Sequence, residues 1–228
     1  MKAVFLTGGE GIRMRPLTLE NPKALLKVGG IPIIERLIAQ LPQKVDELII
    51  VIGYLGEKIQ KYLGDEFMGR KVNYIWQREK RGTYDAIERA RHLLGDEPFA
   101  VFFADDILDK ETIHELLEYP LAAVIAEVAD PRPFGVIVFN PDGTIAEIEE
   151  KPEVPKSHSV LTTAYVLTPQ IFEYAPTPQP NGEFYLSHAL NKMAKDYQIK
   201  SIKAKMWLPI GKPEDILKAE TVLKNLEN

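Results

Sequence analysis

The feature that most constrains the fold of this chain is an alternation of short apolar runs with segments of helical periodicity. Four runs lack the polar–apolar alternation of a half-exposed strand, so each is expected to be a strand buried on both faces. Three segments between them carry apolar residues at helical spacing. This order predicts an α/β fold, a Rossmann-like doubly wound mixed sheet with helices on both faces. The expected strands are 2–6, 47–53, 72–76 and 99–103, and the expected helices are 31–41, 57–63 and 83–94.

The second half of the chain has a different character. Short apolar runs punctuated by Pro and Gly are expected to be further strands, at 121–128, 135–139, 145–149 and 161–167. A helix at 184–197, strands near 199–208 and a helix at 213–226 are expected to follow. The length of 228 residues suits a single domain, 1–228, with halves at 1–110 and 111–228. No hexapeptide array follows the last helix, so no C-terminal β-helix is expected.

Composition argues against several classes of protein. The formal net charge of −5 disfavours general nucleic-acid binding. The chain has no cysteine, which rules out disulfides, thiolate catalysis and cysteine zinc sites. No apolar stretch has the length of a membrane span or the form of a signal peptide. We therefore expect no membrane partner and a cytoplasmic location.

A glycine-rich loop follows the first expected strand. Gly8, Gly9 and Gly11 would let backbone amides approach phosphate oxygens, and Arg13 and Lys23 would add positive charge. The loop lacks the Gly-Lys-Ser/Thr ending of a Walker loop and the third glycine of a dinucleotide-binding fingerprint. A triphosphate-binding loop is one interpretation and a surface loop with solvated cations is the other. The glycines alone do not decide between them.

The loop is the first of a series of motifs in a particular order. Together they resemble the sugar-1-phosphate nucleotidylyltransferases over nearly the whole chain, in particular enzymes of the mannose-1-phosphate guanylyltransferase and glucose-1-phosphate thymidylyltransferase type. The resemblance implies a fold of the nucleotide-diphospho-sugar transferase type. It also implies transfer of a nucleotidyl group from a nucleoside triphosphate to a sugar 1-phosphate, giving a nucleotide sugar and pyrophosphate. The motifs are Gly8-Gly9-Glu10-Gly11-Ile12-Arg13, Pro22-Lys23, Gln77 with Gly82, Asp105, Phe134-Gly135-Val136, Glu149-Glu150-Lys151-Pro152, Gly182-Glu183 and Trp207-Leu208-Pro209-Ile210-Gly211.

The same resemblance implies roles for individual residues. Arg13 and Lys23 would be catalytic, Arg13 by neutralising the leaving pyrophosphate and Lys23 by bridging the reacting phosphates. Gln77 and the backbone of Gly82 would contact the base. Without the resemblance, residues 149–151 would be interpreted as a solvated charge run. The half 1–110 would bind the nucleotide, also through Leu6, Gly8, Gly9 and Gly11, and the half 111–228 would bind the sugar phosphate through Phe134, Gly135, Glu150 and Lys151.

A magnesium ion held by Asp105 is also implied by the resemblance. Mg²⁺ is a hard cation that prefers carboxylate and phosphate oxygens and keeps several of its waters. By itself, a carboxylate at the end of a strand is often a helix cap or a turn residue. The expected partners are the two substrates, and a homo-oligomer is compatible with the sequence.

Four positions depart from the pattern of these enzymes. Ile12 replaces a usual threonine, Ala104 a usual glycine, and residues 161–165 a segment that usually contains asparagine and glycine. Pro209 stands where the relatives carry a second metal-binding aspartate, and proline cannot coordinate. Asp106, Asp215 or water would have to compensate. The alternative function is therefore a catalytically weak relative that binds nucleotide sugars in a regulatory or structural role.

Overall fold

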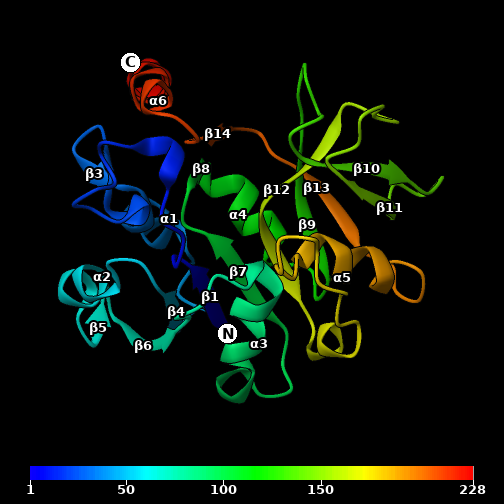
Figure 1. Cartoon of the computed structure of the whole chain (residues 1–228), viewed down its shortest axis with the longest axis horizontal. Coiled ribbons are helices and arrows are strands. Elements are labelled where there is room, and N and C mark those ends of the chain that lie inside the picture. Colours follow the sequence, from blue (N-terminus) through cyan, green and yellow to red (C-terminus); the bar gives the residue numbers. More distant parts are fainter. Residues whose placement is uncertain (228) are drawn as a thin grey trace.

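The computed structural model describes residues 1–227 of the chain. A mixed sheet runs through the molecule in the order β11-β10-β12-β7-β1-β4-β6-β5, with β9 paired to β12 and β13 paired to β9 (Figure 1). Its strands are β1 (Lys2–Leu6), β4 (Glu47–Ile52), β5 (Glu66–Phe67), β6 (Arg70–Trp76), β7 (Phe99–Phe103), β9 (Ala122–Glu127), β10 (Gly135–Phe139), β11 (Ile145–Glu150), β12 (Ser159–Leu167) and β13 (Lys200–Lys203). The predicted fold class is confirmed.

The strands predicted from the first half form the parallel core of this sheet. β1 pairs in parallel with β4 and with β7, and β4 pairs in parallel with β6. Side chains alternate between two apolar clusters, so that Phe5 enters one and its neighbour Val4 enters the other. Helices cover both faces, which explains why these strands are apolar throughout. The face of Phe5 is covered by α1 (Ile33–Gln40), α2 (Gly56–Leu63) and α4 (Lys110–Leu116), and the face of Val4 by α3 (Gly82–Leu94), the 3₁₀ helix η3 (Pro169–Glu173) and α5 (Leu186–Met193).

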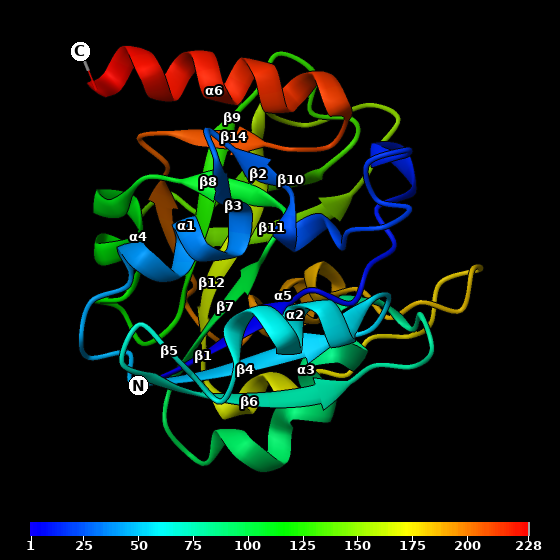
Figure 2. The same ribbon diagram turned by 90° about the vertical axis from the view of Figure 1, so that its left-hand side faces the viewer.

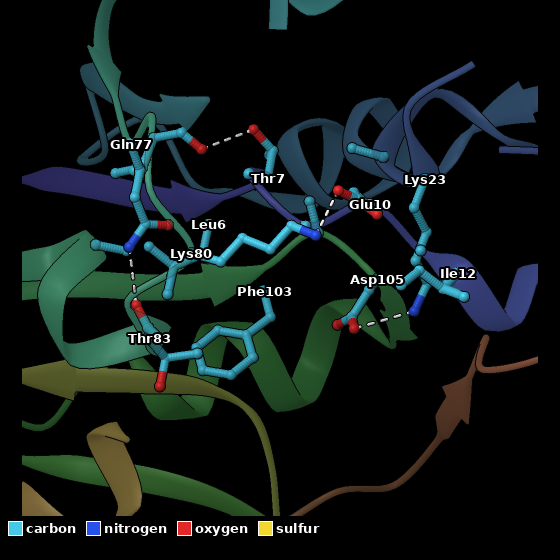
Figure 3. A pocket seen from close by; sticks show the side chains of 18 of the residues that line it. Leu6, Thr7, Glu10, Ile12, Lys23, Gln77, Lys80, Thr83, Phe103 and Asp105 are labelled. Atoms are coloured by element: carbon cyan, nitrogen blue, oxygen red, sulfur yellow. Dashed lines mark hydrogen bonds and ion pairs between the residues drawn. The ribbon is translucent and has the colours of Figure 1, made fainter. Parts of the chain in front are cut away.

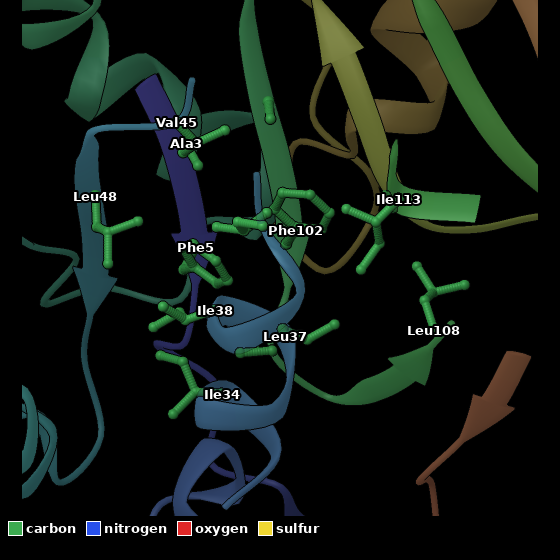
Figure 4. Close-up of a cluster of buried hydrophobic side chains, with 14 of the residues drawn as sticks. Ala3, Phe5, Ile34, Leu37, Ile38, Val45, Leu48, Phe102, Leu108 and Ile113 are labelled. Atoms are coloured by element: carbon green, nitrogen blue, oxygen red, sulfur yellow. The ribbon is translucent and has the colours of Figure 1, made fainter. Parts of the chain in front are cut away.

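The cluster on the Phe5 side shows how tightly α1 closes over the sheet. Phe5 of β1 and Phe102 of β7 stack with ring centroids 5.4 Å apart. Ile34, Leu37 and Ile38 of α1 lie against these rings (Figure 4). All five side chains are at most 2% exposed. Burial of this order stabilises the fold by about 1.5–3 kcal/mol for each large side chain.

The second half of the chain continues the same sheet in antiparallel fashion. β12 pairs antiparallel with β7 and with β9. β10 and β11 form a hairpin whose register places Gly135 opposite Glu150. Two residues predicted for the sugar-phosphate side are therefore neighbours across one ladder.

A smaller apolar cluster holds the C-terminal helix against the rest of the molecule. α6 (Pro213–Glu227) lies along the short sheet formed by β8 (Asp106–Leu108) and β14 (Trp207–Pro209) (Figure 2). Met14, Ile107, Ile210 and Ala219 are buried between them. The cluster therefore packs α6 against β8, the strand that follows Asp105.

The structure differs from the sequence-based expectation in several local details. The helix expected from residue 31 begins at Ile33, because β3 (Ile31–Pro32) pairs with β2 (Lys27–Val28). The helix expected at 184–197 is limited to α5, because Tyr185 is extended and Phe184 exchanges backbone hydrogen bonds with Arg81 and Tyr84 at 2.8 and 2.9 Å. α4 and β8 were not expected, although Asp109 caps α4 by accepting from the amide of Thr112. The expected loop 7–30 contains the 3₁₀ helices η1 (Ile12–Met14) and η2 (Lys23–Leu25). Within residues 1–227, no helix has both the length and the apolar character needed to cross a membrane.

Candidate active site

A cavity of about 440 Å³ opens at the carboxyl ends of β1, β6 and β7 (Figure 3). This is the edge at which doubly wound sheets bind their ligands. Most of its lining comes from residues 1–110, and Glu183, Tyr185 and Gly211 enter from the second half. It collects every residue predicted for the nucleotide, for catalysis and for the metal: Leu6, Gly8, Gly9, Gly11, Arg13, Lys23, Gln77, Gly82 and Asp105.

The glycine loop has the shape it does because Gly11 adopts a left-handed conformation. Its φ is +58°, which favours glycine, and a Cβ there would come within 3.0 Å of Thr18 and 3.3 Å of Lys23. The Thr18 hydroxyl donates to the Gly11 carbonyl at 2.8 Å. The turn folds the loop back so that Arg13, in η1, and Lys23, in η2, line one cavity.

The two predicted catalytic cations are in different states. Arg13 is exposed and has no ion-pair or hydrogen-bond partner in the part of the chain that the structure describes. The side chain of Lys23 is only 14% exposed, and its ammonium lies 3.0 Å from Oδ2 of Asp105. One cation is thus free for an anionic ligand, and the other is held beside a carboxylate.

The neighbouring carboxylates Asp105 and Asp106 point to different environments. Oδ1 of Asp105 is buried and accepts no hydrogen bond from the described residues. Oδ2 of Asp106 accepts from the Trp207 indole at 2.7 Å and from the Thr163 hydroxyl at 3.1 Å. Burial, followed by repulsion from Asp105, raises the pKa of Asp106. Of these two aspartates, only Asp105 therefore offers a carboxylate oxygen to the cavity.

The other candidate replacements for the missing aspartate are also unsuitable. Pro209 is exposed and lies opposite Asp106 in the β14–β8 pair. Asp215 uses its carboxylate to accept from the amides of Gly211 and Lys212, at 3.0 and 2.9 Å, at the start of α6. In residues 1–227, no cluster of three or more metal-ligating side chains occurs. Among the aspartates considered for the metal, only Asp105 is left to hold a cation in this cavity.

Gln77 and Gly82 meet at the start of α3. Nε2 of Gln77 donates to the Gly82 carbonyl at 3.0 Å and to Oδ2 of Asp85 at 2.9 Å. Gly82 has φ +87°, and a Cβ there would lie 2.5 Å from the Phe184 carbonyl oxygen, so only glycine fits. The amide plane of Gln77 and the first turn of α3 therefore form one fixed wall of the cavity.

The residues predicted for the sugar phosphate come together outside this cavity. The amide of Lys151 donates to the Phe134 carbonyl at 2.9 Å, and Glu150 lies beside Gly135 across the hairpin. Glu150 accepts from the Ser187 hydroxyl at 2.7 Å and lies 3.4 Å from the Lys151 ammonium. None of the four predicted residues lines the cavity. They form a second cluster on its far side.

Tyr185 connects the two clusters, and the sequence motifs did not single it out. It lines the cavity, and the Lys151 ammonium lies 5.3 Å from its ring centroid. Its position two residues after Gly182-Glu183 was the available signal.

Glu10 and Lys80 also line the cavity and form an ion pair across it (Figure 3). Glu10 lies within the glycine motif and Lys80 three residues after Gln77, but neither position indicates the pairing.

Fold and cavity define a doubly wound α/β protein with its ligand site at the ends of parallel strands. A family model described as nucleotidyl transferase matches residues 2–225. The chain therefore belongs to the nucleotidyl transferase family. The predicted family and the predicted class of enzyme are confirmed.

Relatives of known sequence support this assignment. AglF of Haloferax volcanii, a UTP–glucose-1-phosphate uridylyltransferase, is 34% identical over 236 residues, covering 98% of this chain and 97% of AglF. The bifunctional protein GlmU of Methanocaldococcus jannaschii is 33% identical over 226 residues, which make up 98% of this chain and 54% of GlmU. The chain thus spans about half the length of the GlmU proteins that it matches.

Solved structures agree. A UDP-glucose pyrophosphorylase complexed with UDP-glucose superposes with a TM-score of 0.85 at 25% identity, covering 99% of this chain and 98% of the other. A putative glucose-1-phosphate thymidylyltransferase from Bacillus anthracis superposes with a TM-score of 0.87 at 25% identity, covering 99% and 96%. Both chains match over almost their full length, so the second half of the fold is shared as well as the first.

Proposed function

We propose that this protein transfers a nucleotidyl group from a nucleoside triphosphate to a sugar 1-phosphate and releases pyrophosphate. The observation that carries the proposal is the convergence of the glycine loop, the partner-free Arg13 and the Lys23–Asp105 pair in one cavity. The names of AglF and of the two structural neighbours describe the same class of reaction. Residues 1–110 would bind the nucleotide and residues 111–228 the sugar phosphate.

The reaction needs positioning and neutralisation of charge more than proton transfer. A sugar-phosphate oxygen attacks the α-phosphorus, a P–O bond forms, and the bond to the β-phosphate breaks with its electron pair leaving on pyrophosphate. The attacking oxygen is already anionic, so no general base is required. Arg13 would neutralise the leaving pyrophosphate, and Lys23 would lie between the reacting phosphates. Lys151 would bind the phosphate of the sugar substrate, and Glu150 its hydroxyl groups.

The residues of the cavity fit a hard divalent cation, which we propose to be Mg²⁺. Oδ1 of Asp105 is buried without a hydrogen-bond donor, as expected of an oxygen available to a ligand. Mg²⁺ commonly binds through one or two carboxylates together with substrate phosphates. Bound beside Asp105, it would supply positive charge to the triphosphate oxygens. A cytoplasmic location and a homo-oligomeric state remain predictions.

Pyrophosphate release tests the proposal. We expect release from at least one pairing of UTP, dTTP or GTP with glucose 1-phosphate, mannose 1-phosphate or N-acetylglucosamine 1-phosphate, in the presence of Mg²⁺. Omission of the sugar phosphate is the control. Binding of a nucleotide sugar without pyrophosphate release from any pair would instead support the catalytically weak alternative, which the single carboxylate at this site favours.

A further inference from the structure

The side-chain amide of Gln77 can be oriented in only one way. Its Nε2 faces the carbonyl of Gly82 at 3.0 Å and the carboxylate of Asp85 at 2.9 Å. A carbonyl and a carboxylate accept hydrogen bonds, so the NH₂ group must face them. Rotation of the amide by half a turn would bring Oε1 against two other acceptors. Oε1 is thereby left on the cavity side, 3.3 Å from the position of a Cβ on Gly8 (Figure 3).

Asp85 is itself held in place from the side away from the cavity. Nε of Arg89, one turn further along α3, donates to the same Oδ2 at 2.7 Å. The Asp85 side chain is 14% exposed, and that of Arg89 is 33% exposed. Gln77, Asp85 and Arg89 therefore form a short chain of hydrogen bonds that runs from the cavity wall to the surface of α3.

The fixed orientation of Gln77 determines which of its hydrogen-bonding groups faces the cavity. Oε1 of Gln77 accepts no hydrogen bond among residues 1–227, and Gln77 and Gly82 both line the cavity. Gly82 is the first residue of α3, where no preceding helical carbonyl is available to the amide. The wall therefore presents one acceptor, Oε1 of Gln77, and one donor, the N–H of Gly82.

We propose that Asp85 and Arg89 are positioning residues that fix Gln77 as an acceptor, so that the bound base must donate to Oε1. The inference rests on the proposed function, because it assumes that the base of a nucleoside triphosphate occupies this wall. Uracil and guanine present a ring N–H next to a carbonyl. In cytosine and adenine the ring nitrogen at that position is an acceptor. The donor is the exocyclic amine, one position along the edge. With the ribose and phosphates held, the fixed wall distinguishes the two classes of base.

Equilibrium binding of nucleotides tests this without requiring turnover. UTP against CTP, and GTP against ATP, compare bases of equal size that differ in their donor pattern. In the unaltered protein, UTP should bind about tenfold to a hundredfold more tightly than CTP, and GTP more tightly than ATP by a similar factor. The reason is that the ring nitrogen of cytosine or adenine would face Oε1 as a second acceptor. Asp85→Ala should bring both ratios closer to one, since only the Gly82 carbonyl then holds the amide. Arg89→Ala should give a smaller change in the same direction.

Matched variants and ligands separate positioning from general damage. Asp85→Asn should keep the ratios, because Arg89 selects the amide oxygen and leaves it to accept from Gln77. Glu88→Ala, on the same helix, removes an exposed pair with Arg91 and should change nothing. Inorganic tripolyphosphate, which has no base, should bind equally to the unaltered protein and to Asp85→Ala.

The outcomes distinguish this inference from the proposed function. If UTP and CTP bind equally to the unaltered protein, or if Asp85→Ala keeps its ratios, the positioning role is wrong while the proposed function stands. If no triphosphate binds, both are wrong. The expected result is a ratio that falls in Asp85→Ala and is kept in Asp85→Asn, with unchanged tripolyphosphate binding.

Discussion

The proposed nucleotide side and the proposed sugar-phosphate side of this molecule are built differently. The nucleotide side consists of loops that leave the parallel strands β1, β6 and β7, and its Arg13 has no partner among the described residues. The sugar-phosphate side sits on the antiparallel hairpin β10–β11, where Glu150 and Lys151 already contact each other and their neighbours Ser187 and Tyr185.

Under the proposed function, the difference predicts where binding and where catalysis are concentrated. Free positive charge at the ends of parallel strands is suited to an anion whose charge shifts during reaction. Side chains that already hold one another are suited to fixing the position of a substrate. Changes on the first side should therefore lower turnover, and changes on the second should raise the KM for the sugar phosphate.

A loss of turnover by orders of magnitude is expected from changes to the two cations of the proposed nucleotide side. Lys23→Ala and Arg13→Ala should each lower turnover by on the order of 10²–10³, because each removes a preorganised charged donor. Melting temperatures should change little for Arg13→Ala, since that side chain is exposed. Lys61→Ala, an exposed lysine on α2, is the control. Near-normal turnover in both variants would show that the triphosphate does not bind to this loop.

A smaller effect is expected from restoring the second carboxylate. Pro209→Asp should lower the Mg²⁺ concentration needed for half-maximal activity several-fold, because two carboxylates hold the cation more firmly than one. Pro209→Asn has a similar shape without the charge and should leave the requirement unchanged. Asp105→Asn should abolish activity in either background. An unchanged Mg²⁺ requirement in Pro209→Asp would place the cation elsewhere.

The sugar-phosphate side should respond through binding. Ser187→Ala removes a hydrogen bond to Glu150, worth about 1 kcal/mol, and should raise the KM for the sugar phosphate roughly fivefold. The KM for the triphosphate should not change. Ser201→Ala removes a hydroxyl that donates to the Gly143 carbonyl, away from both clusters, and is the control. A change in the triphosphate KM alone would contradict the division into two sides.

The smallest effect on activity is expected from a change at Asp109, which does not line the cavity. Asp109 caps α4 and also accepts from the Met206 amide at 2.8 Å. Burial alone would raise the pKa of Asp109, but the hydrogen bonds from Thr112 and Met206 outweigh it and lower that pKa. Since the folded pKa lies below the unfolded one, this stabilisation is present above the unfolded pKa and is lost as the pH falls through the folded pKa.

Asp109→Ala should therefore cost about 1 kcal/mol of unfolding free energy at neutral pH, with little change in activity at 25 °C. Denaturant unfolding at several pH values measures it. The difference between the two proteins should shrink as the medium becomes acidic. A constant difference at all pH values would show that the ionised carboxylate is not what holds this corner.

The sequence by itself determined the parallel core, the glycine loop and several of the residues that line the cavity. The reason is that a strand buried on both faces and a helix with one apolar face each leave a local pattern, as in 2–6 and 83–94. Those patterns place Leu6, Gln77 and Asp105 at the end of a strand or just after one, and parallel strands end at a common edge. The resemblance of the motifs then identified the family.

Only the tertiary structure decided which side chains meet. Tyr185 reaches the cavity because Phe184 is bonded to the start of α3, a contact between segments about a hundred residues apart. Asp106 is turned away because Trp207 and Thr163 reach it from two other strands. Gln77 is fixed by Asp85, and the direction of a side-chain amide is set by its hydrogen-bond partners in space, which no local periodicity records.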